Sequence, residues 1–265
     1  GMHYLITGHT GFKGAWLSLW LKSLGHEVSG ISLDPIPDSL FDRANISEVL
    51  QNDFRIDIRK FDEVKSALLQ VNPDVVFHMA AQPLVRESYA DPRYTFETNA
   101  MGTLSLLEAV SNTPSVNAHV VVTTDKVYRN INQVAGYVES DPLGGHDPYS
   151  ASKAACEIAV ASWRASFGAE IGTIATARAG NVIGGGDFGA ERLIPDLVRA
   201  RMAGETLIIR RPDATRPFQH VLDVLRGYLL HAEALWVGAA PPALNFGPRD
   251  AEISVRRVLE LYGTA

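Results

Sequence analysis

Two short groups of residues in this chain have the side chains that proton transfer requires. Thr124, Asp125 and Lys126 follow an apolar segment, and Tyr149 precedes Lys153 by four residues. Residues four apart lie on one face of a helix, so the phenol and the ammonium group are neighbours. Hydride transfer alone needs no second acid and base, whereas Asp125 and Lys126 add both. The sequence therefore predicts an oxidation coupled to a further proton-transfer step.

Tyr149 can act as a base near neutral pH only if its phenolate is stabilised. A free phenol has a pKa near 10, and lowering it by three units requires about 4 kcal/mol. The Lys153 ammonium, one helical turn away, supplies part of this by charge attraction. A Tyr and a Lys at this spacing also occur on solvated helix faces. The Thr124 hydroxyl and a glycine-rich loop earlier in the chain favour the catalytic interpretation.

The glycine-rich segment has the spacing of a phosphate-binding loop. Gly8, Gly11 and Gly14 lie between an apolar segment and a helical pattern. Glycines there permit a tight turn and a close approach of the backbone to a diphosphate. The start of the helix adds free N–H groups and the positive end of its dipole. The alternative, a glycine-rich turn without a ligand, is disfavoured by this position between strand and helix.

Asp34 ends the next apolar segment, about 20 residues after Gly14. A carboxylate at this position binds the ribose hydroxyls of adenosine and repels a 2′-phosphate, so NAD is predicted rather than NADP. An Asp before Pro35 also fits a solvated turn. Cys156 is the one cysteine and is expected to pack rather than to react, so the redox chemistry must come from the cofactor.

The elements that must position these residues alternate between strand and helix. Apolar patterns predict strands at 3–7, 27–33, 54–56, 75–79, 119–123 and 171–177, and helices at 15–24, 61–71, 94–111 and 149–167. Such alternation requires right-handed crossovers between parallel strands. The predicted fold class is therefore α/β, a doubly wound parallel sheet with helices on both faces, formed by residues 1–178.

The pattern changes after residue 178. A run of three glycines is followed by an expected helix at 194–203, a strand at 206–209 and a helix at 221–236. We expect residues 179–265 to form a small substrate-binding lobe at the carboxyl edge of the sheet, where ligands of open α/β sheets bind.

The composition is that of an ordinary globular protein. The 265 residues are 46% hydrophobic and 20% charged, which is enough to bury a core in one domain or in a domain with a lobe. The formal net charge of −6 and the lack of a Lys/Arg run argue against nucleic acid and anionic membranes as partners. No apolar run reaches the roughly 18 residues of a membrane span, and no signal-peptide pattern begins the chain. A cytoplasmic location and no metal site are expected.

The chain resembles the extended short-chain dehydrogenase/reductase family of nucleotide-sugar enzymes, and within it the CDP-glucose 4,6-dehydratases most closely. The segments that carry the resemblance are GHTGFKG at 8–14, HMAAQPLVR at 78–86, NAMGT at 99–103, TTDKVY at 123–128, YSASK at 149–153, NVIGGGD at 181–187, RLIPD at 192–196 and RPFQHV at 216–221. The glycine loop and the Tyr/Lys pair are shared by the whole superfamily. The Thr-Asp-Lys triplet and the last three segments are typical of a much narrower group of enzymes.

The resemblance implies a Rossmann fold, NAD as the cofactor and a lyase activity. The implied reaction dehydrates an NDP-hexose, CDP-glucose above all, to a 4-keto-6-deoxy sugar nucleotide by internal hydride transfer. Tyr149, with Thr124, would take the proton of the sugar 4-hydroxyl, and Asp125 would act as the acid on the 6-hydroxyl. Lys126 would occupy the position of the base at carbon 5. Because a lysine accepts a proton only when neutral, Lys126 could instead orient the substrate or polarise the ketone.

The resemblance also implies binding residues. The implied cofactor-binding residues are Gly8, Thr10, Gly11, Phe12, Lys13, Gly14, Asp34, Asp57, Ile58, Ala80, Ala81, Gln82, Asn99, Thr123, Tyr149 and Lys153. The implied substrate-binding residues are Arg86, Ser88, Asn181, Arg192, Arg216 and His220. Arginine suits a diphosphate because its planar fork donates two parallel hydrogen bonds, although any single Arg can equally form a surface ion pair.

Three other functions compete with this interpretation. A nucleotide-sugar 4-epimerase needs Tyr149 and NAD but no dehydrating acid and base, and a dehydratase of dTDP-glucose or GDP-mannose would share most motifs. A non-catalytic dinucleotide-binding protein would have little use for Thr124, Tyr149 and Lys153 together. The resemblance further implies a homodimer formed through the helices at 94–111 and 149–167. Family members continue beyond Pro248, so we expect a lobe shortened at its C-terminal end.

Overall fold

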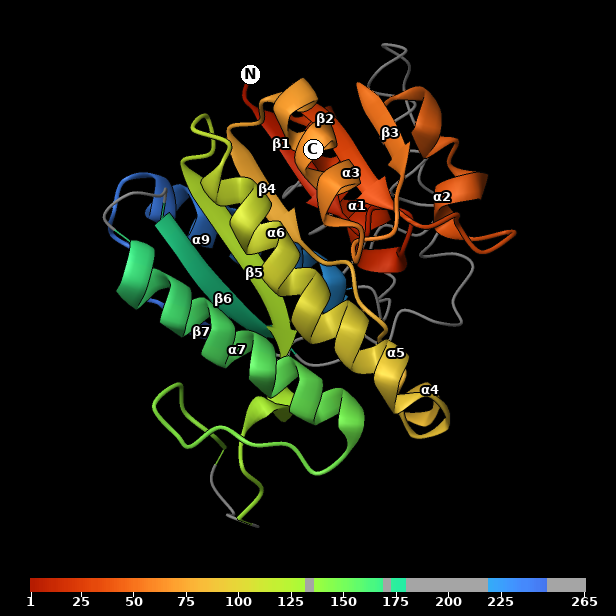
Figure 1. Ribbon diagram of the computed structural model, residues 1–265. Helices are drawn as coiled ribbons and strands as arrows, with labels where there is room; N and C mark the ends of the chain where they lie inside the picture. Colours follow the sequence, from red (N-terminus) through yellow and green to blue (C-terminus); the bar gives the residue numbers. More distant parts are fainter. Residues whose placement is uncertain (132–135, 169–172, 180–218, 247–265) are drawn as a thin grey trace.

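The computed structural model describes residues 1–131, 136–168, 173–179 and 219–246, with side chains from residue 224 onward in the last segment. Its strands form one parallel sheet in the order β3-β2-β1-β4-β5-β6-β7 (Figure 1). They are β1 (His3–Thr7), β2 (Glu27–Ser32), β3 (Asn52–Arg55), β4 (Val75–His78), β5 (Ala118–Thr124), β6 (Thr173–Ala179) and β7 (Ala243–Phe246).

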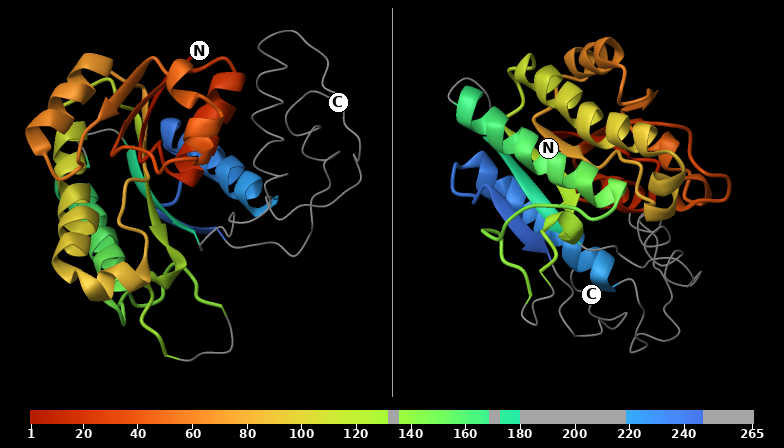
Figure 2. Two further views of the ribbon diagram at one scale, coloured as in Figure 1. Left: turned by 90° about the vertical axis from the view of Figure 1, so that its right-hand side faces the viewer. Right: turned by 60° about the horizontal axis from the view of Figure 1, so that its bottom comes forward.

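Helices cover both faces of this sheet. They are α1 (Phe12–Ser23), α2 (Leu40–Arg43), α3 (Phe61–Val71), α4 (Val85–Ala90), α5 (Pro92–Phe96), α6 (Gly102–Ser111), α7 (Pro148–Phe167) and α9 (Gln219–Trp236), with the short turns η1 (Ile46–Glu48), η2 (Glu97–Met101) and η3 (Asp125–Val127). Helices α3, α6 and α7 lie on one face, and α1 and α9 lie on the other (Figures 1 and 2). The predicted doubly wound α/β fold is confirmed.

The alternation of side chains along the central strands explains the two layers. Tyr4 and Ile6 of β1 are buried with residues of α1 and α9, whereas Leu5 between them is buried with residues of α3 and α6. Successive side chains of a strand point to opposite faces, so a strand covered by helices on both sides must be apolar throughout. This is why Tyr4, Leu5 and Ile6 of β1 and Val75, Val76 and Phe77 of β4 are continuous apolar runs rather than alternating ones.

The last two described elements belong to the sheet rather than to a separate lobe. The sequence-based division places everything after residue 178 in the lobe, but β7 pairs in parallel with β6. Leu225 and Tyr228 of α9 are buried in the same core as α1. Strand β7 therefore extends the sheet, and α9 covers one of its faces. The helix expected at 194–203 and the strand expected at 206–209 lie outside the described residues.

The helix predicted at 94–111 is three consecutive segments, preceded by α4. Asp91 accepts a hydrogen bond from the Tyr94 N–H at 3.0 Å and starts α5. The turn η2 is a π-helix, a feature that occurs mostly as single turns and often at functional sites. Within it the Asn99 carbonyl accepts hydrogen bonds from Thr103 Oγ1 at 2.6 Å and Cys156 Sγ at 2.7 Å. Cys156 is buried, as expected for a packing residue.

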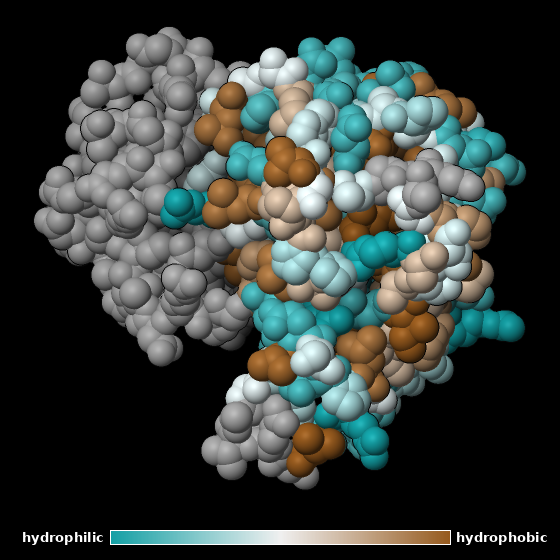
Figure 3. Space-filling view, turned by 90° about the vertical axis from the view of Figure 1, so that its left-hand side faces the viewer, coloured by the Kyte–Doolittle hydropathy of each residue, from teal (hydrophilic) through white to brown (hydrophobic). Residues whose placement is uncertain are grey.

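On the face shown in Figure 3, hydrophobic and hydrophilic residues are interspersed over the described elements. Among the residues that the structure describes, no helix combines the length and the apolar character that crossing a bilayer requires.

Candidate active site

A cleft of about 740 Å³ opens where the loops leave β1, β2, β3 and β4. Parallel strands present their carboxyl ends at one edge of the sheet, where open α/β folds bind ligands. The cleft is lined by many of the predicted cofactor residues: Gly8, Thr10, Gly11, Phe12, Lys13, Gly14, Asp34, Asp57, Ile58, Ala80 and Ala81. The structure thus gathers these sequence-distant residues around one cavity.

Each glycine of the loop is required for a different structural reason. Gly8 has a φ of +77°, and a Cβ there would lie 2.7 Å from the Ala80 nitrogen. A Cβ on Gly14 would lie 2.2 Å from the Gly8 oxygen. Gly11 begins α1 without a side-chain cap, and the first turn contains no acidic residue. An uncapped helix start in a wall of the cleft suits a diphosphate, so these residues fit a dinucleotide.

Lys13 connects this cleft to the predicted catalytic residues. Its Nζ lies 3.4 Å from the Tyr228 hydroxyl of α9 and 5.9 Å from the centre of that ring. Burial and the nearby charge of Lys153 lower the pKa of Lys13 to about 8, against the opposing effect of Asp125. The sequence predicted Lys13 only as part of the loop. The structure adds that its ammonium interacts with both Lys153 and Asp125.

Tyr149 is placed by the start of α7. Asp147 caps this helix by accepting hydrogen bonds from the Ser150 N–H at 2.9 Å and the Ser150 hydroxyl at 2.8 Å. Pro148 occupies the first helical position, which suits its fixed φ and missing N–H. Tyr149 and Lys153 therefore lie in the first two turns, and both are about 5% exposed.

Thr124 links the two catalytic groups that the sequence separates. It ends β5 and hydrogen bonds to Tyr149, and this bond opposes the rise in the Tyr149 pKa that burial causes. Thr124 Oγ1 also lies 3.2 Å from Asp125 Oδ1 and 3.3 Å from the Lys126 nitrogen. Asp125 and Lys126 are exposed. Burial lowers the pKa of Lys153. The structure thus brings Thr124 and Tyr149 into contact, with Asp125 and Lys126 in the adjoining turn.

Three predicted cofactor residues use their side chains for internal contacts. Asn99 Oδ1 accepts the Gln82 N–H at 2.8 Å, and its Nδ2 donates to the Gln82 carbonyl at 3.1 Å and to Ser152 Oγ at 3.0 Å. Thr123 Oγ1 donates to Glu157 Oε1 at 2.7 Å. All of these side chains are buried. The Gln82 side-chain amide donates to the Leu84 carbonyl at 3.0 Å and to Thr95 Oγ1 at 2.9 Å. The side chains of Gln82, Asn99 and Thr123 thus position the cleft rather than line it.

The predicted substrate residues are only partly described. Ser88 is fully buried, and its hydroxyl donates to the Val85 carbonyl at 2.5 Å, so its side chain packs inside the protein instead of lining a sugar pocket. Arg86 is exposed on α4. His220 lies in the first turn of α9, and its side chain is not described. The remaining predicted residues lie outside the described ranges: Asn181, Arg192 and Arg216.

A buried hydrogen-bond chain that the sequence did not reveal supports the floor of the cleft. Thr7 Oγ1 accepts the N–H groups of Met79 and Ala80 at 3.0 and 3.1 Å, so its proton points to His78 Nδ1 at 2.6 Å. The His78 proton therefore lies on Nε2 and is donated to Thr103 Oγ1 at 2.8 Å. Burial lowers the pKa of His78 well below its usual value. A neutral His78 thus ties β1, β4 and α6 together.

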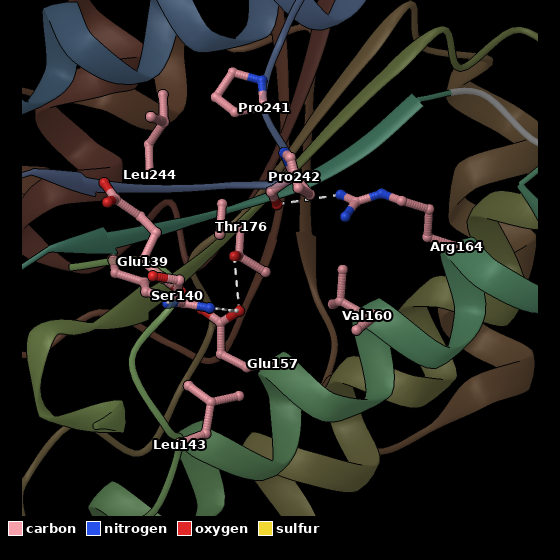
Figure 4. Close-up of a pocket in the computed structure, with 13 residues that line it drawn as sticks. Glu139, Ser140, Leu143, Glu157, Val160, Arg164, Thr176, Pro241, Pro242 and Leu244 are labelled. Carbon is pink, nitrogen blue, oxygen red and sulfur yellow. Dashed lines mark hydrogen bonds and ion pairs between the residues drawn. The ribbon is translucent and has the colours of Figure 1, made fainter. Parts of the chain in front are cut away.

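A second cavity of about 620 Å³ lies between α7, β6 and the segment before β7 (Figure 4). Glu157 and Thr176 point toward one another at its base, at 2.7 Å. Arg164 donates across it to the Pro242 carbonyl at 3.2 Å. None of the predicted site residues lines this cavity. Among the described residues, no group of three or more His, Cys, Asp or Glu side chains could hold a metal ion.

A parallel Rossmann sheet with this glycine loop, and with Tyr149 and Lys153 buried on one helix whose Lys153 interacts with Lys13 of the cleft, defines an extended short-chain dehydrogenase/reductase. The comparisons with known proteins agree. The chain belongs to the NAD dependent epimerase/dehydratase family, whose model matches residues 4–247. This membership confirms the predicted family and the predicted cofactor, NAD.

Its relatives are enzymes of nucleotide-sugar metabolism. A CDP-glucose 4,6-dehydratase of Salmonella typhimurium is 43% identical over 99% of this chain and 77% of its own length. A dTDP-glucose 4,6-dehydratase of Xanthomonas campestris is 30% identical over 77% of this chain and 60% of its own length. Among solved structures, Thermus thermophilus UDP-glucose 4-epimerase with NAD has a TM-score of 0.69 at 26% identity, covering 100% of this chain and 84% of that one.

Proposed function

We propose that the protein is an NAD-dependent nucleotide-sugar 4,6-dehydratase that converts CDP-glucose to a 4-keto-6-deoxy sugar nucleotide with loss of water. The observation that carries this proposal is the 43% identity to a CDP-glucose 4,6-dehydratase over 99% of the chain. The arrangement of Thr124, Asp125 and Lys126 in one turn beside Tyr149 supplies the additional acid and base that dehydration needs.

The residues of the chain divide the proton transfers between them. Tyr149 takes the proton of the sugar 4-hydroxyl as the phenolate, and the hydrogen bond with Thr124 stabilises this phenolate before the transfer. Asp125 gives a proton to the departing 6-hydroxyl, so that water leaves. When bound, NAD would supply the group that accepts the hydride of carbon 4 and later donates it to carbon 6. Lys126 stands in the position of the base that removes the proton from carbon 5 and returns a proton to it when carbon 6 receives the hydride, so that the net change is the loss of one water.

The base assignment has a direct test. Lys126 is exposed, and an amine becomes a base near neutral pH only when burial or positive charge favours its neutral form. Substrate must therefore cover Lys126 before it can act. In deuterated water, Lys126→Ala should abolish exchange at carbon 5, while Lys60→Ala, an exposed lysine at the start of α3, should not. Normal exchange in Lys126→Ala would leave Lys126 an orienting residue only.

The second proposed function is a nucleotide-sugar 4-epimerase, favoured by solved epimerases of similar fold. The two functions separate in one experiment. We would incubate the protein with NAD and, in turn, CDP-glucose, dTDP-glucose, UDP-glucose and GDP-mannose, and measure the ultraviolet absorbance that alkali produces from 4-keto-6-deoxy sugars. CDP-glucose should give the strongest signal, and Tyr149→Phe should give none. Epimerised sugar without this absorbance would establish the epimerase instead.

We also propose that the protein is a cytoplasmic homodimer. Large hydrophobic side chains are exposed on α4, α5, η2 and α7: Tyr89, Phe96, Met101 and Ile158. Helices α6 and α7 are those expected to pair between subunits, and exposed apolar side chains on adjacent helices are typical of an interface. Light scattering on the eluting protein should give the mass of a dimer. Ile158→Glu should produce a monomer that keeps its helical content.

A further inference from the structure

A chain of polar and charged side chains runs from the glycine loop to Asp34, which lines the cleft. His9, in the glycine loop, places its Nε2 2.7 Å from Asp53 Oδ1. Asp53 in turn receives two bonds from Arg55, with Nε at 2.9 Å and Nη2 at 2.8 Å. Arg55 then extends Nη1 to Asp34 Oδ1 at 3.1 Å. Residues from the loop, from β3 and from the end of β2 are thus joined in one series.

The series holds the Arg55 guanidinium in one orientation. Burial raises the pKa of Asp53, but the hydrogen bonds from His9 and Arg55 outweigh it and hold that pKa well below its usual range. An ionised Asp53 binds the planar fork of Arg55 at two points, which fixes its direction. The guanidinium also lies 5.3 Å from the centre of the Phe41 ring. Because one edge of the fork is fixed on Asp53, Nη1 is directed at Asp34.

Asp34 depends on this contact for its position. Its side chain is 86% exposed, so packing does not restrain it. The backbone beside it is held by Thr10, whose Oγ1 lies 2.6 Å from Ser32 Oγ and donates to the Leu33 carbonyl at 3.0 Å. The backbone position is therefore fixed by the glycine loop, and the carboxylate position by Arg55.

We propose that Arg55 is the specificity-determining residue at the adenosine end of the cofactor site. In this chain it holds the Asp34 carboxylate for the two hydroxyls of the adenosine ribose. In the absence of that carboxylate, the same guanidinium binds the 2′-phosphate of NADP. This inference rests on the NAD site and is independent of which nucleotide sugar the enzyme dehydrates.

The charges explain why both roles belong to one residue. A carboxylate after β2 accepts hydrogen bonds from the ribose diol, whereas an arginine near that position accommodates a 2′-phosphate. Here Asp34 and Asp53 both face Arg55, so two negative charges surround one guanidinium and a phosphate is repelled. Removing Asp34 leaves Arg55 with Asp53 alone and frees Nη1 to donate to an anion. The fork remains oriented because the His9–Asp53 side of the series is untouched.

Binding of NAD and NADP to four proteins tests the inference. Calorimetric titration would compare the wild type with Asp34→Asn, Asp34→Ser and the double variant Asp34→Ser/Arg55→Met, each checked for an unchanged melting temperature. NADP should bind at least about tenfold more tightly to both single variants than to the wild type, the effect of about one charge-assisted hydrogen bond. In the double variant this gain should disappear. The gain should also shrink at high salt, because it depends on charge.

A matched control separates Arg55 from a general loss of negative charge. Asp38 lines the same cleft and has a φ of +59°, which Asn tolerates, so Asp38→Asn removes a charge without freeing Arg55. It should leave NADP binding within about threefold of the wild type. The inference is overturned if Asp34→Ser gains no NADP affinity, if the double variant keeps the gain, or if Asp38→Asn produces the same gain.

Discussion

Glu157→Gln tests whether the buried ion pair behind the active site stabilises both the fold and the charge on Lys153. Glu157 of α7 accepts hydrogen bonds from Thr123 and Thr176, each at 2.7 Å, and from Arg178 Nε at 2.9 Å and Nη2 at 3.1 Å. Glu157 and Arg178 are both nearly fully buried. Each carboxylate oxygen therefore receives one hydroxyl and one guanidinium proton.

A glutamine cannot satisfy these four donors. Whichever way its amide points, the NH₂ group faces one threonine hydroxyl and one Arg178 N–H. The hydroxyl can rotate to accept a hydrogen bond, but the guanidinium has no acceptor. Removing one partner of a buried pair typically costs about 3–5 kcal/mol because the other charge stays buried. We expect a loss near the lower limit, about 3 kcal/mol, because one oxygen remains.

Thermal and urea unfolding followed by circular dichroism measure this cost. A loss of about 3 kcal/mol corresponds to a fall in melting temperature of roughly 6–12 °C for a protein of this size. Glu108→Gln is the matched control, since Glu108 is an exposed glutamate of α6. It should change the free energy of unfolding by less than about 0.5 kcal/mol.

The same variant has a catalytic consequence. Burial lowers the pKa of Lys153, and the charge of Glu157 is among the effects that oppose this. Without that charge the pKa of Lys153 falls further, so Lys153 loses its proton at a lower pH and the alkaline fall in activity moves to lower pH. A Glu157→Gln protein that loses less than about 1 kcal/mol, or keeps the wild-type alkaline limb, would refute the reasoning.

Three further predictions concern the cleft and the catalytic residues beside it. Gly8→Ala and Gly25→Ala both place a side chain at positive φ, but only the Cβ at Gly8 meets neighbouring atoms. Only Gly8→Ala should therefore weaken NAD binding in a titration. Equal losses of affinity in the two variants would contradict the role of the loop. Thr124→Val removes a hydrogen bond that lowers the Tyr149 pKa. Since one hydrogen bond contributes about 1 kcal/mol, the acid limb of the pH–activity profile should move to higher pH by about 0.7 unit. An unchanged limb would show that Thr124 does not act on Tyr149. The NAD affinity of the wild type should fall as the pH rises through about 8, where Lys13 loses its proton. Lys13→Met should bind NAD more weakly and without this pH dependence. The same pH dependence in Lys13→Met would show that Lys13 is not the group responsible for it.

Most of the sheet was predictable because each signal is local. The strand at His3–Thr7 and the helix at Phe61–Val71 were predicted with the observed bounds, since an apolar run or a helical period identifies itself within a few residues. The helix at 94–111 was predicted as one segment, and its division at η2 was missed. A π turn has no strong sequence signal of its own and is stabilised here by tertiary donors, Thr103 Oγ1 and Cys156 Sγ.

The residues of the candidate site could be identified from the sequence, but their individual roles could not. The loop from Gly8 to Gly14 and the residue Asp34 were identified by spacing, and they line one cleft. Ser88 was expected to contact a sugar, yet its hydroxyl is buried against its own helix. Arg55 was not singled out, because nothing in its local sequence shows that β3 brings it beside Asp34.

The sequence by itself determined the chemistry that this protein has available: a glycine loop, a Tyr/Lys pair one helical turn apart and an adjacent Thr-Asp-Lys triplet. These are properties of short segments, so spacing along the chain identifies them. Only the tertiary structure decided which side chains face the cleft and which are used to hold it. The parallel order of the sheet decided that, since it brings β3 beside β2 and α9 beside α1, and with them Arg55 to Asp34 and Tyr228 to Lys13.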